Sequence, residues 1–201
     1  KNTIRMFALA GAVVQLLVCT FLAFEFNKYS PGIINGQMLF ESSVPWFASL
    51  NINYHIGVDG ISVAMIMLTA FVVIAGVLVS WNVKRLTSSY FFMLILLSLG
   101  AYGFFISLDL FTMFVFYEIA VIPMYLLIGI WGSGPKEYSA MKLTLMLMGA
   151  SAVLLVGILG IYFNSNADGG PLTFNILEIA KVNIPVEAQK LFFPLTFIGF
   201  A

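Results

Sequence analysis

Apolar residues gather in long runs along this chain, and short polar stretches separate the runs. Five runs come close to or exceed the roughly 20 apolar residues that a helix needs to cross a bilayer. Because lipid satisfies backbone hydrogen bonds only within helices or closed barrels, each run is predicted to be a transmembrane helix. The predicted spans are 4–26, 61–81, 90–107, 110–131 and 140–163.

A sixth apolar run, 191–201, is too short to cross a membrane. The chain starts without methionine and stops inside this run, so it is interpreted as part of a longer protein whose next helix is truncated here. We expect an all-α, polytopic transmembrane helix bundle. Its predicted parts are 1–60, the first transmembrane helix and an extracytoplasmic loop; 61–163, a four-helix transmembrane part; 164–190, an extracytoplasmic loop with a short interfacial helix; and 191–201, the start of a further helix.

Two connections between the spans carry some structure of their own. The connection between the first two spans holds prolines and glycines in a segment of mixed polarity, which favours an extended surface loop. Between the fifth and sixth runs, residues 173–181 are predicted to form one short interfacial helix that buries Phe174, Leu177 and Ala180.

The turn between the third and fourth spans is very short. Only Ser107, Leu108 and Asp109 are free to reverse the chain. Asp109 is predicted to be the N-cap of the fourth span, with its carboxylate accepting hydrogen bonds from the first free N–H groups. The third and fourth spans should therefore form a tight antiparallel hairpin.

Composition excludes several classes of protein. Hydrophobic residues make up 61% of the chain and charged residues 9%, far from the balance of a soluble domain. The only cysteine, Cys19, cannot build a disulfide framework or a cluster site, and the only histidine, His55, argues against haem held by two histidines. No phosphate loop, nucleophile elbow or basic patch for nucleic acid is present. Redox chemistry and cofactors are therefore not expected on residues of this chain.

Charged residues separate between alternate connections. One side has six basic residues against one acidic residue, and the other has three against seven. Cytoplasmic connections of membrane proteins are enriched in lysine and arginine, which predicts a cytoplasmic N-terminus in a bacterial plasma membrane. The basic side holds Lys1, Arg5, Lys84, Arg85, Lys136, Glu137 and Lys142; the other holds Glu25, Lys28, Glu41, Asp59, Asp109, Asp168, Glu178, Lys181, Glu187 and Lys190.

Glu118 is the one charged residue that neither side accommodates. It follows Asp109 by nine residues, which places it roughly 13 Å along the fourth span, near the bilayer midplane. An ionisable group there costs about 2.5 to 3.5 kcal/mol and usually marks an ion pathway or proton relay. A neighbouring cation that moves or titrates can switch its charge. The structural alternative is a neutral glutamic acid that is permanently hydrogen-bonded to another helix.

Two further residues of the fourth span are candidates for the same path. Pro123 cannot donate to the carbonyl of Ile119, so a kink and a free carbonyl are expected beside Glu118. Tyr125 shares the helical face of Glu118 and is a candidate for orienting water. Packing alone is the alternative role for both residues.

Candidates outside the fourth span are weaker. Ser98 and Tyr102 form a polar pair one turn apart on the third span and are candidates to line the path, although packing between helices explains them equally. Lys142, near the start of the fifth span, is a candidate for biasing protons at the cytoplasmic mouth, or a residue that snorkels to the interface.

The stretch 110–132, LFTMFVFYEIAVIPMYLLIGIWG, resembles the glutamate-bearing helix of the antiporter-like subunits of respiratory complex I. The likeness is greatest to subunit M, called ND4 in mitochondria. Segments 54–62 and 136–151 support it. Tyr117 stands where the family often has tryptophan. The residues that carry the pattern are Tyr117, Glu118, Pro123, Met124, Tyr125, Trp131 and Gly132.

This resemblance implies the first part of an inverted-repeat fold, in which each repeat carries a broken helix and half of a hydrated proton path. It also implies that Glu118 pairs with a lysine expected shortly beyond Ala201. The expected function is proton translocation in an NADH:quinone oxidoreductase, next to the antiporter-like subunits L and N. NADH, FMN, Fe–S clusters and quinone are then expected in partner subunits.

Two alternatives to this function stay open at the level of sequence. The related subunits of multi-subunit sodium/proton (Mrp-type) antiporters have the same helix and work without redox activity. A membrane scaffold with an inert glutamate is the second alternative, and it predicts that Glu118→Gln leaves pumping intact.

Overall fold

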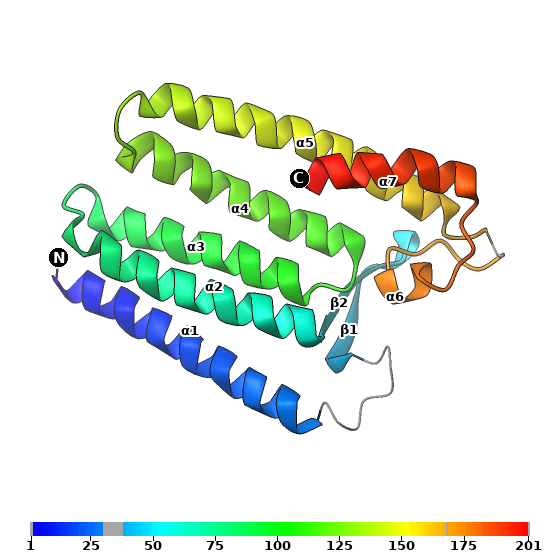
Figure 1. Ribbon diagram of the computed structural model, residues 1–201, viewed down its shortest axis with the longest axis horizontal. Helices are drawn as coiled ribbons and strands as arrows, with labels where there is room; N and C mark the ends of the chain where they lie inside the picture. The colour runs from blue at the N-terminus through cyan, green and yellow to red at the C-terminus, as the bar shows by residue number, and fades with distance from the viewer. Residues whose placement is uncertain (1, 30–37, 168, 201) are drawn as a thin grey trace.

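The computed structural model describes residues 2–29, 38–167 and 169–200, and its long helices lie side by side in chain order (Figure 1). Five of them are long and apolar enough to cross a membrane, which confirms the predicted spans to within a few residues. The chain is therefore a multi-pass helical membrane protein. The five helices are α1 (Asn2–Tyr29), α2 (Gly60–Val79), α3 (Thr87–Ile106), α4 (Leu110–Trp131) and α5 (Lys136–Asn164).

The connection between α1 and α2 contains an antiparallel hairpin, where an irregular extended loop was predicted. Strand β1 (Leu39–Phe47) pairs with β2 (Ile52–Val58) through the short 3-10 turn η2 (Ala48–Leu50). The register shifts beside Pro45, which has no N–H to give to the ladder. The part of the predicted loop at 30–37 lies outside the described residues.

The predicted helix at 173–181 is much shorter in the structure. Helix α6 covers only Ile176–Ile179, because the backbone before it is extended and the Phe174 carbonyl accepts from the N–H of Leu110 at 3.0 Å. Phe174 is buried as predicted and Leu177 is half-buried. Ala180 is exposed, so that part of the prediction is wrong.

Helix α7 (Val186–Phe200) starts before the apolar run from which it was predicted. Its first turn is polar and includes Glu187 and Lys190, whose side chains pair at 3.3 Å. Helix α7 packs against α5. Elsewhere, a second short 3-10 turn, η3 (Ser80–Asn82), follows the end of α2. Hydropathy alone therefore placed the start of the sixth helix too late.

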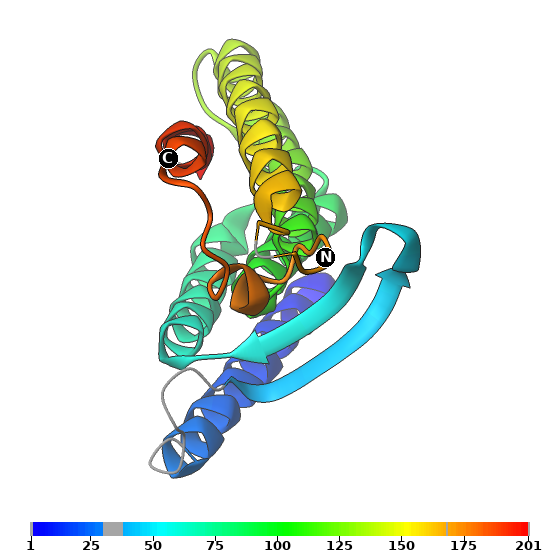
Figure 2. The ribbon, with the colours of Figure 1, turned by 90° about the vertical axis from the view of Figure 1, so that its right-hand side faces the viewer.

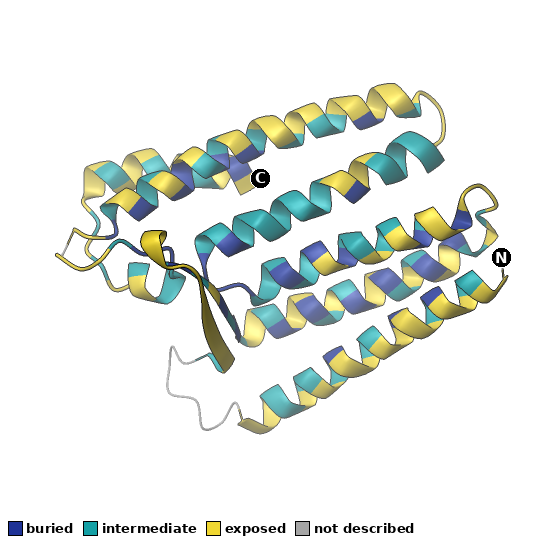
Figure 3. Ribbon diagram, turned by 180° about the vertical axis from the view of Figure 1, so that it is seen from behind, coloured by how far each residue is buried: buried dark blue, intermediate teal, exposed yellow. Residues whose placement is uncertain are grey.

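Helices α3 and α4 approach closely through small residues. A Cβ on Gly100 would lie 3.0 Å from the Cβ of Ala120 and 3.1 Å from the carbonyl oxygen of Phe116. Small residues at such crossings let helix backbones come together where lipid gives no hydrophobic driving force. Large apolar side chains are exposed on the outward faces of the helices, most clearly on α1 and α5 (Figure 3).

The two ends of the bundle differ in charge. We call the end that holds the start of α1 and the α2–α3 and α4–α5 connections the basic face. The end that holds the hairpin, the α3–α4 turn and α6 is the hairpin face (Figure 1). Apart from Glu118, the described charged residues lie toward the two ends as the alternation of spans predicted, with Lys1 and Asp168 outside the described residues. Which end faces the cytoplasm stays a prediction.

The hairpin face ties three distant segments together, and Figure 2 views the molecule from this side. The N–H of Leu108 donates to the His55 carbonyl at 2.8 Å, and the Leu108 carbonyl accepts from Ile176 at 3.0 Å. The α3–α4 turn therefore lies between β2 and the chain leading into α6. Below it is a buried cluster made of Ile52, Leu154, Ile158, Tyr162 and Phe174.

Candidate functional site

Asp109 anchors the helix that carries the site. Its Oδ1 accepts from the N–H groups of Phe111 at 3.0 Å and Thr112 at 3.1 Å, which confirms the predicted N-cap. Its Oδ2 accepts from the N–H of Asn53 at 3.5 Å, so the cap also reaches β2. Asp109 is fully buried, and burial raises the pKa of its carboxyl against the opposing effect of these hydrogen bonds. The first turn of α4 is thus fixed to the hairpin face.

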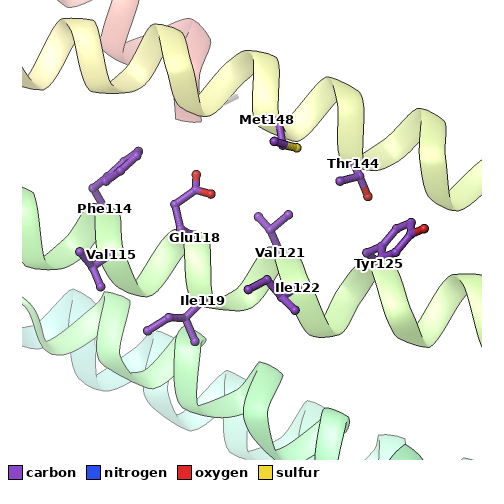
Figure 4. Close-up of a pocket in the computed structure, with 9 residues that line it drawn as sticks. All are labelled: Phe114, Val115, Glu118, Ile119, Val121, Ile122, Tyr125, Thr144 and Met148. Atoms are coloured by element: carbon purple, nitrogen blue, oxygen red, sulfur yellow. The ribbon is translucent and has the colours of Figure 1, made fainter.

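Glu118 lies in the middle of α4 and points into a cavity of about 450 Å³ between α4 and α5 (Figure 4). The predicted shared face of Glu118 and Tyr125 is confirmed, since both residues line this cavity. The full lining is Phe114, Val115, Glu118, Ile119, Val121, Ile122, Tyr125, Thr144 and Met148.

Within the described part of the chain, the carboxylate of Glu118 lacks a hydrogen-bond partner for one of its oxygens. Its Oε1 is buried and has no hydrogen-bond partner among the described residues. Leaving a buried polar atom without a partner costs about 1 to 3 kcal/mol, and more for a charged group. The side chain therefore has unused capacity to bind a proton, a cation or water.

Pro123 lies inside α4, which continues without interruption through it to Trp131. Because proline has no N–H, the carbonyl of Ile119 loses its usual helical donor beside Glu118. Pro123 is itself buried. Proline therefore removes one backbone donor from the helix close to Glu118.

Tyr125 and Thr144 are the other polar side chains of the cavity. The Oγ1 of Thr144 donates to the carbonyl of Ala140 at 2.9 Å, which leaves its lone pairs free to accept. Thr144 was not predicted, because a threonine on α5 reaches the Glu118 cavity only through the antiparallel register of α4 and α5. No pattern within α5 alone indicates it.

The remaining predicted residues lie elsewhere. Ser98 is buried and donates to the carbonyl of Ile95 at 2.7 Å, and Tyr102 lines a separate cavity beside Cys19. Lys142 is exposed on α5 and does not line the Glu118 cavity. The structure thus places Glu118 and Tyr125 on one cavity. Pro123 is on the same helix but does not line that cavity, and Ser98, Tyr102 and Lys142 lie elsewhere.

A second polar pair, which sequence reasoning also missed, lies on the hairpin. The His55 Nε2 is 2.9 Å from the Glu41 Oε1, with His55 buried and Glu41 half-exposed. The pair arises from the register of the two strands, which the sequence did not predict. Among residues 2–29, 38–167 and 169–200, no group of three or more histidine, cysteine or acidic side chains is placed to hold a metal ion.

Fold and site together define a multi-pass membrane protein with a carboxylate halfway along one membrane-crossing helix and an adjoining cavity. Residues 107–201 match the protein family described as "NADH:quinone oxidoreductase/Mrp antiporter, TM". The resemblance to antiporter-like subunits is therefore confirmed.

Curated relatives extend the match over the whole chain. It is 33% identical over 204 residues to "NAD(P)H-quinone oxidoreductase chain 4, chloroplastic" of Angiopteris evecta, and 33% identical over 202 residues to the protein of the same name from Morus indica. Each match covers 100% of this chain and 39% of the relative. The chain thus spans about two fifths of the length of these relatives.

Three solved structures share the fold. A chain of the membrane-bound sulfane sulfur reductase, an archaeal respiratory membrane complex, matches with a TM-score of 0.79 at 24% identity, over 100% of this chain and 39% of that one. Respiratory complex I from Thermus thermophilus gives 0.76 at 24% identity, over 96% and 38%. The Mrp complex from Dietzia sp. DQ12-45-1b gives 0.72 at 20% identity, over 100% and 36%. At these identities the likeness shows the fold alone.

Proposed function

We propose that this chain provides a proton-transfer step through Glu118 in the membrane part of an NADH:quinone oxidoreductase of the complex I type. The observation that carries the proposal is the buried, unpartnered carboxylate oxygen of Glu118, which faces a cavity halfway along a membrane-crossing helix. The names of the curated relatives support the redox assignment and favour the subunit M (ND4) likeness.

The chemistry required of Glu118 is a reversible change of charge. A nearby cation favours the charged form of a carboxyl group, and its departure favours the protonated form. A cationic side chain that moves toward or away from the cavity would therefore make Glu118 release or bind a proton. The family resemblance supports a lysine in this role. When the cation is away, Glu118 holds the proton as a neutral carboxylic acid. Asp109 keeps the helix that carries Glu118 in place.

Electron transfer is proposed to lie in other subunits. With Cys19 and His55 as its only cysteine and histidine, the chain cannot ligate an Fe–S cluster with residues of its own. We therefore place NADH, FMN, the Fe–S clusters and quinone in partner subunits. Antiporter-like subunits of the L and N type are the proposed neighbours in the membrane.

The proposed orientation follows from the charges of the two faces. The basic face carries Arg5, Lys84, Arg85 and Lys136, and the positive-inside rule places such a face on the cytoplasmic side. We propose a bacterial plasma membrane with the N-terminal end of this chain in the cytoplasm. The support is the charge rule alone, since the curated relatives carry chloroplastic names.

A sodium/proton antiporter of the Mrp type is the second candidate. The family description names both kinds of protein, and the Mrp complex from Dietzia shares the fold. In that case Glu118 would carry protons in exchange for sodium, without NADH oxidation. NADH:quinone activity of the purified complex separates the two, because only the first candidate has it.

Glu118→Gln tests the proposal. In the complete complex, reconstituted in liposomes, we expect assembly to be preserved and proton pumping to be severely reduced, as measured by the quenching of a pH-sensitive dye during NADH oxidation. Glu137→Gln is the matched control, since Glu137 is exposed on the basic face. Near-normal pumping in Glu118→Gln would contradict the proposal. It would favour the alternative of a membrane scaffold with an inert glutamate.

A further inference from the structure

We infer that Arg5, Lys84 and Arg85 form a binding site for the headgroup of an anionic phospholipid at the basic face. We call these three residues the cationic cluster. The inference goes beyond the proposed function, since no step of it involves Glu118. It is carried by positive charges that the fold gathers at the ends of α1, α2 and α3 and leaves without an acidic partner among the described residues.

A hydrogen bond between residues 78 positions apart brings the cationic cluster together. The Nη2 of Arg5 donates to the carbonyl oxygen of Val83 at 3.1 Å, and Val83 directly precedes Lys84 and Arg85. Figure 1 shows the start of α1 and the α2–α3 connection at the same end of the bundle. The guanidinium of Arg5 therefore lies against the backbone that carries the other two basic side chains.

The backbone of the α2–α3 connection is also held by side chains of α3 and α4. The Oγ1 of Thr87, in the first turn of α3, donates to the Val83 carbonyl at 3.2 Å. The Nε1 of Trp131, the last residue of α4, donates to the Arg85 carbonyl at 2.7 Å. Because this backbone is already fixed, less conformational entropy is lost when a ligand binds to the side chains that it presents.

The basic side chains themselves are available to a ligand. Lys84 and Arg85 are exposed, and neither side chain forms an ion pair within residues 2–29, 38–167 and 169–200. Arg5 is half-buried, and its Nε is buried without a hydrogen-bond partner in the same part of the chain. Glu137, in the first turn of α5, is the one acidic residue described at this end, and it pairs with no member of the cluster. The cationic cluster therefore attracts an external anion.

The cationic cluster lies at the depth of phospholipid headgroups. Helix α1 begins at Asn2, α2 ends at Val79 and α3 begins at Thr87, so all three basic residues are at or just beyond helix ends. The rings of Tyr90 and Trp131 meet edge to face at this level, with centroids 5.3 Å apart. Tyrosine and tryptophan are enriched where membrane proteins cross the headgroup region. A phosphate group of the bilayer is thus within reach of the cluster.

Exposed apolar side chains adjoin the cations. Met6 follows Arg5 and is 65% exposed, and Leu86 follows Arg85 and is 56% exposed. Val79, at the end of α2, is 84% exposed. A phospholipid offers a phosphate to the cations and acyl chains to these apolar side chains, whereas a soluble anion offers only the first. The combination favours a lipid over free phosphate.

The charge of the cluster favours an anionic headgroup over a zwitterionic one. Arginine binds phosphate oxygens through two parallel N–H groups, and lysine binds them as a point charge. In phosphatidylcholine a quaternary ammonium offsets the phosphate, so the headgroup has no net charge for the cluster to attract. In phosphatidylglycerol the phosphate charge is not offset. Basic residues beside transmembrane helices bind anionic lipids for this reason.

Photo-crosslinking of lipids tests the site in the complete complex. The complex is placed in nanodiscs of phosphatidylcholine that contain a small fraction of phosphatidylglycerol with a photoreactive diazirine beside its headgroup. We expect labelling of residues 79–92 to exceed that by a phosphatidylcholine with the same diazirine by at least about five-fold, the effect of one basic residue near an anionic headgroup. Equal labelling by the two lipids would show ordinary contact with the bilayer and overturn the inference.

Charge variants test which residues hold the headgroup. We expect Lys84→Gln and Arg85→Gln each to lower labelling by phosphatidylglycerol about five-fold, and Lys84→Arg to retain it because the charge is kept. Lys142→Gln is the matched control, since Lys142 is an exposed lysine of α5 outside the cationic cluster. An equal loss in Lys142→Gln would show an effect of net charge alone. An equal loss in Lys84→Arg would show a structural effect, and either result overturns the inference.

Inorganic phosphate distinguishes a lipid from a soluble anion. Added to the nanodiscs, phosphate should reduce the labelling no more than chloride of the same ionic strength, because both ions then act only by screening. Displacement by phosphate alone would assign the cationic cluster to a soluble anion and overturn the lipid assignment. None of these results depends on pumping by Glu118→Gln, so the proposed function is judged separately.

Discussion

His55 and Glu41 pair across the two strands of the hairpin, with 2.9 Å between Nε2 and Oε1. The His55 side chain is 5% exposed and that of Glu41 is 49% exposed, so the pair joins the interior of the hairpin face to its surface. The His55 carbonyl also accepts from Leu108 in the α3–α4 turn. The pair therefore supports the hairpin at the point where it meets the helix bundle.

A double-mutant cycle on this pair should give a favourable coupling. We expect about 0.5 to 1 kcal/mol between His55→Ala and Glu41→Ala, at the low end of values for contacting residues because Glu41 is solvated. The measurement is the thermal unfolding of the purified complex for both single variants and the double variant. Strictly additive effects would contradict the pairing.

Asp109 should make stability depend on pH. Burial raises the pKa of Asp109 in the folded protein, so the folded state binds this proton more tightly than the unfolded chain. The resulting stability is fully present below the unfolded pKa of about 4 and is lost as the pH rises through the raised folded pKa. The melting temperature of the wild-type complex, relative to Asp109→Asn, should therefore fall as the pH rises from about 4 toward 7.

Asparagine is suitable for this comparison because it also caps helices and does not titrate. Asp109→Ala provides the control, and it should cost about 1 kcal/mol through the lost cap. A difference between wild type and Asp109→Asn that stays flat or grows with pH would argue against a buried carboxyl that favours its proton.

The close crossing of α3 and α4 predicts a steric effect at Gly100. Valine at this position would push against the Ala120 and Phe116 backbone, and we expect the complex to lose about 1 to 3 kcal/mol of stability. Gly149→Val is the control on α5, where an added Cβ has no neighbouring atom within 4 Å. Thermal unfolding compares the two, and equal losses would show that helix propensity explains the result.

Pro123→Ala should strengthen α4 and weaken pumping. Alanine restores an N–H for the Ile119 carbonyl, which adds about 0.5 to 1.5 kcal/mol of helix hydrogen bonding and removes an acceptor for water. We expect a higher melting temperature with a reduced ratio of protons pumped to NADH oxidised. Pro194→Ala, the equivalent change inside α7, should leave that ratio unchanged. Unaltered pumping in Pro123→Ala would assign Pro123 to packing alone.

Sequence reasoning succeeded where a property depends on one helix. The spans follow from apolar runs, the Asp109 cap from a short turn, and the shared face of Glu118 and Tyr125 from the helical period. All of these are properties of a single helix or turn and do not depend on how two segments align.

Prediction from the sequence failed where a feature depends on how two segments align with each other. Thr144 lines the Glu118 cavity because α4 and α5 run antiparallel at one particular offset, and His55 meets Glu41 because of the strand pairing. The short α6 has the same origin, since the bond from Leu110 to Phe174 holds that segment extended against its local preference. Packing across the bundle sets such offsets. The periodicity of apolar residues along one segment does not predict them.

The tie across the hairpin face has a consequence for how the protein is made. The Asn51 side chain donates to the carbonyl of Leu172, 121 residues later, at 3.0 Å. At about 5 to 20 residues per second, the ribosome needs roughly 6 to 24 s to synthesise the intervening chain. From the synthesis of Leu108 until that of Ile176, the α3–α4 turn has β2 on one side and lacks its partner on the other. The hairpin face is therefore completed only after α5 has been made, and the last helices of this segment finish a structure that the first ones began.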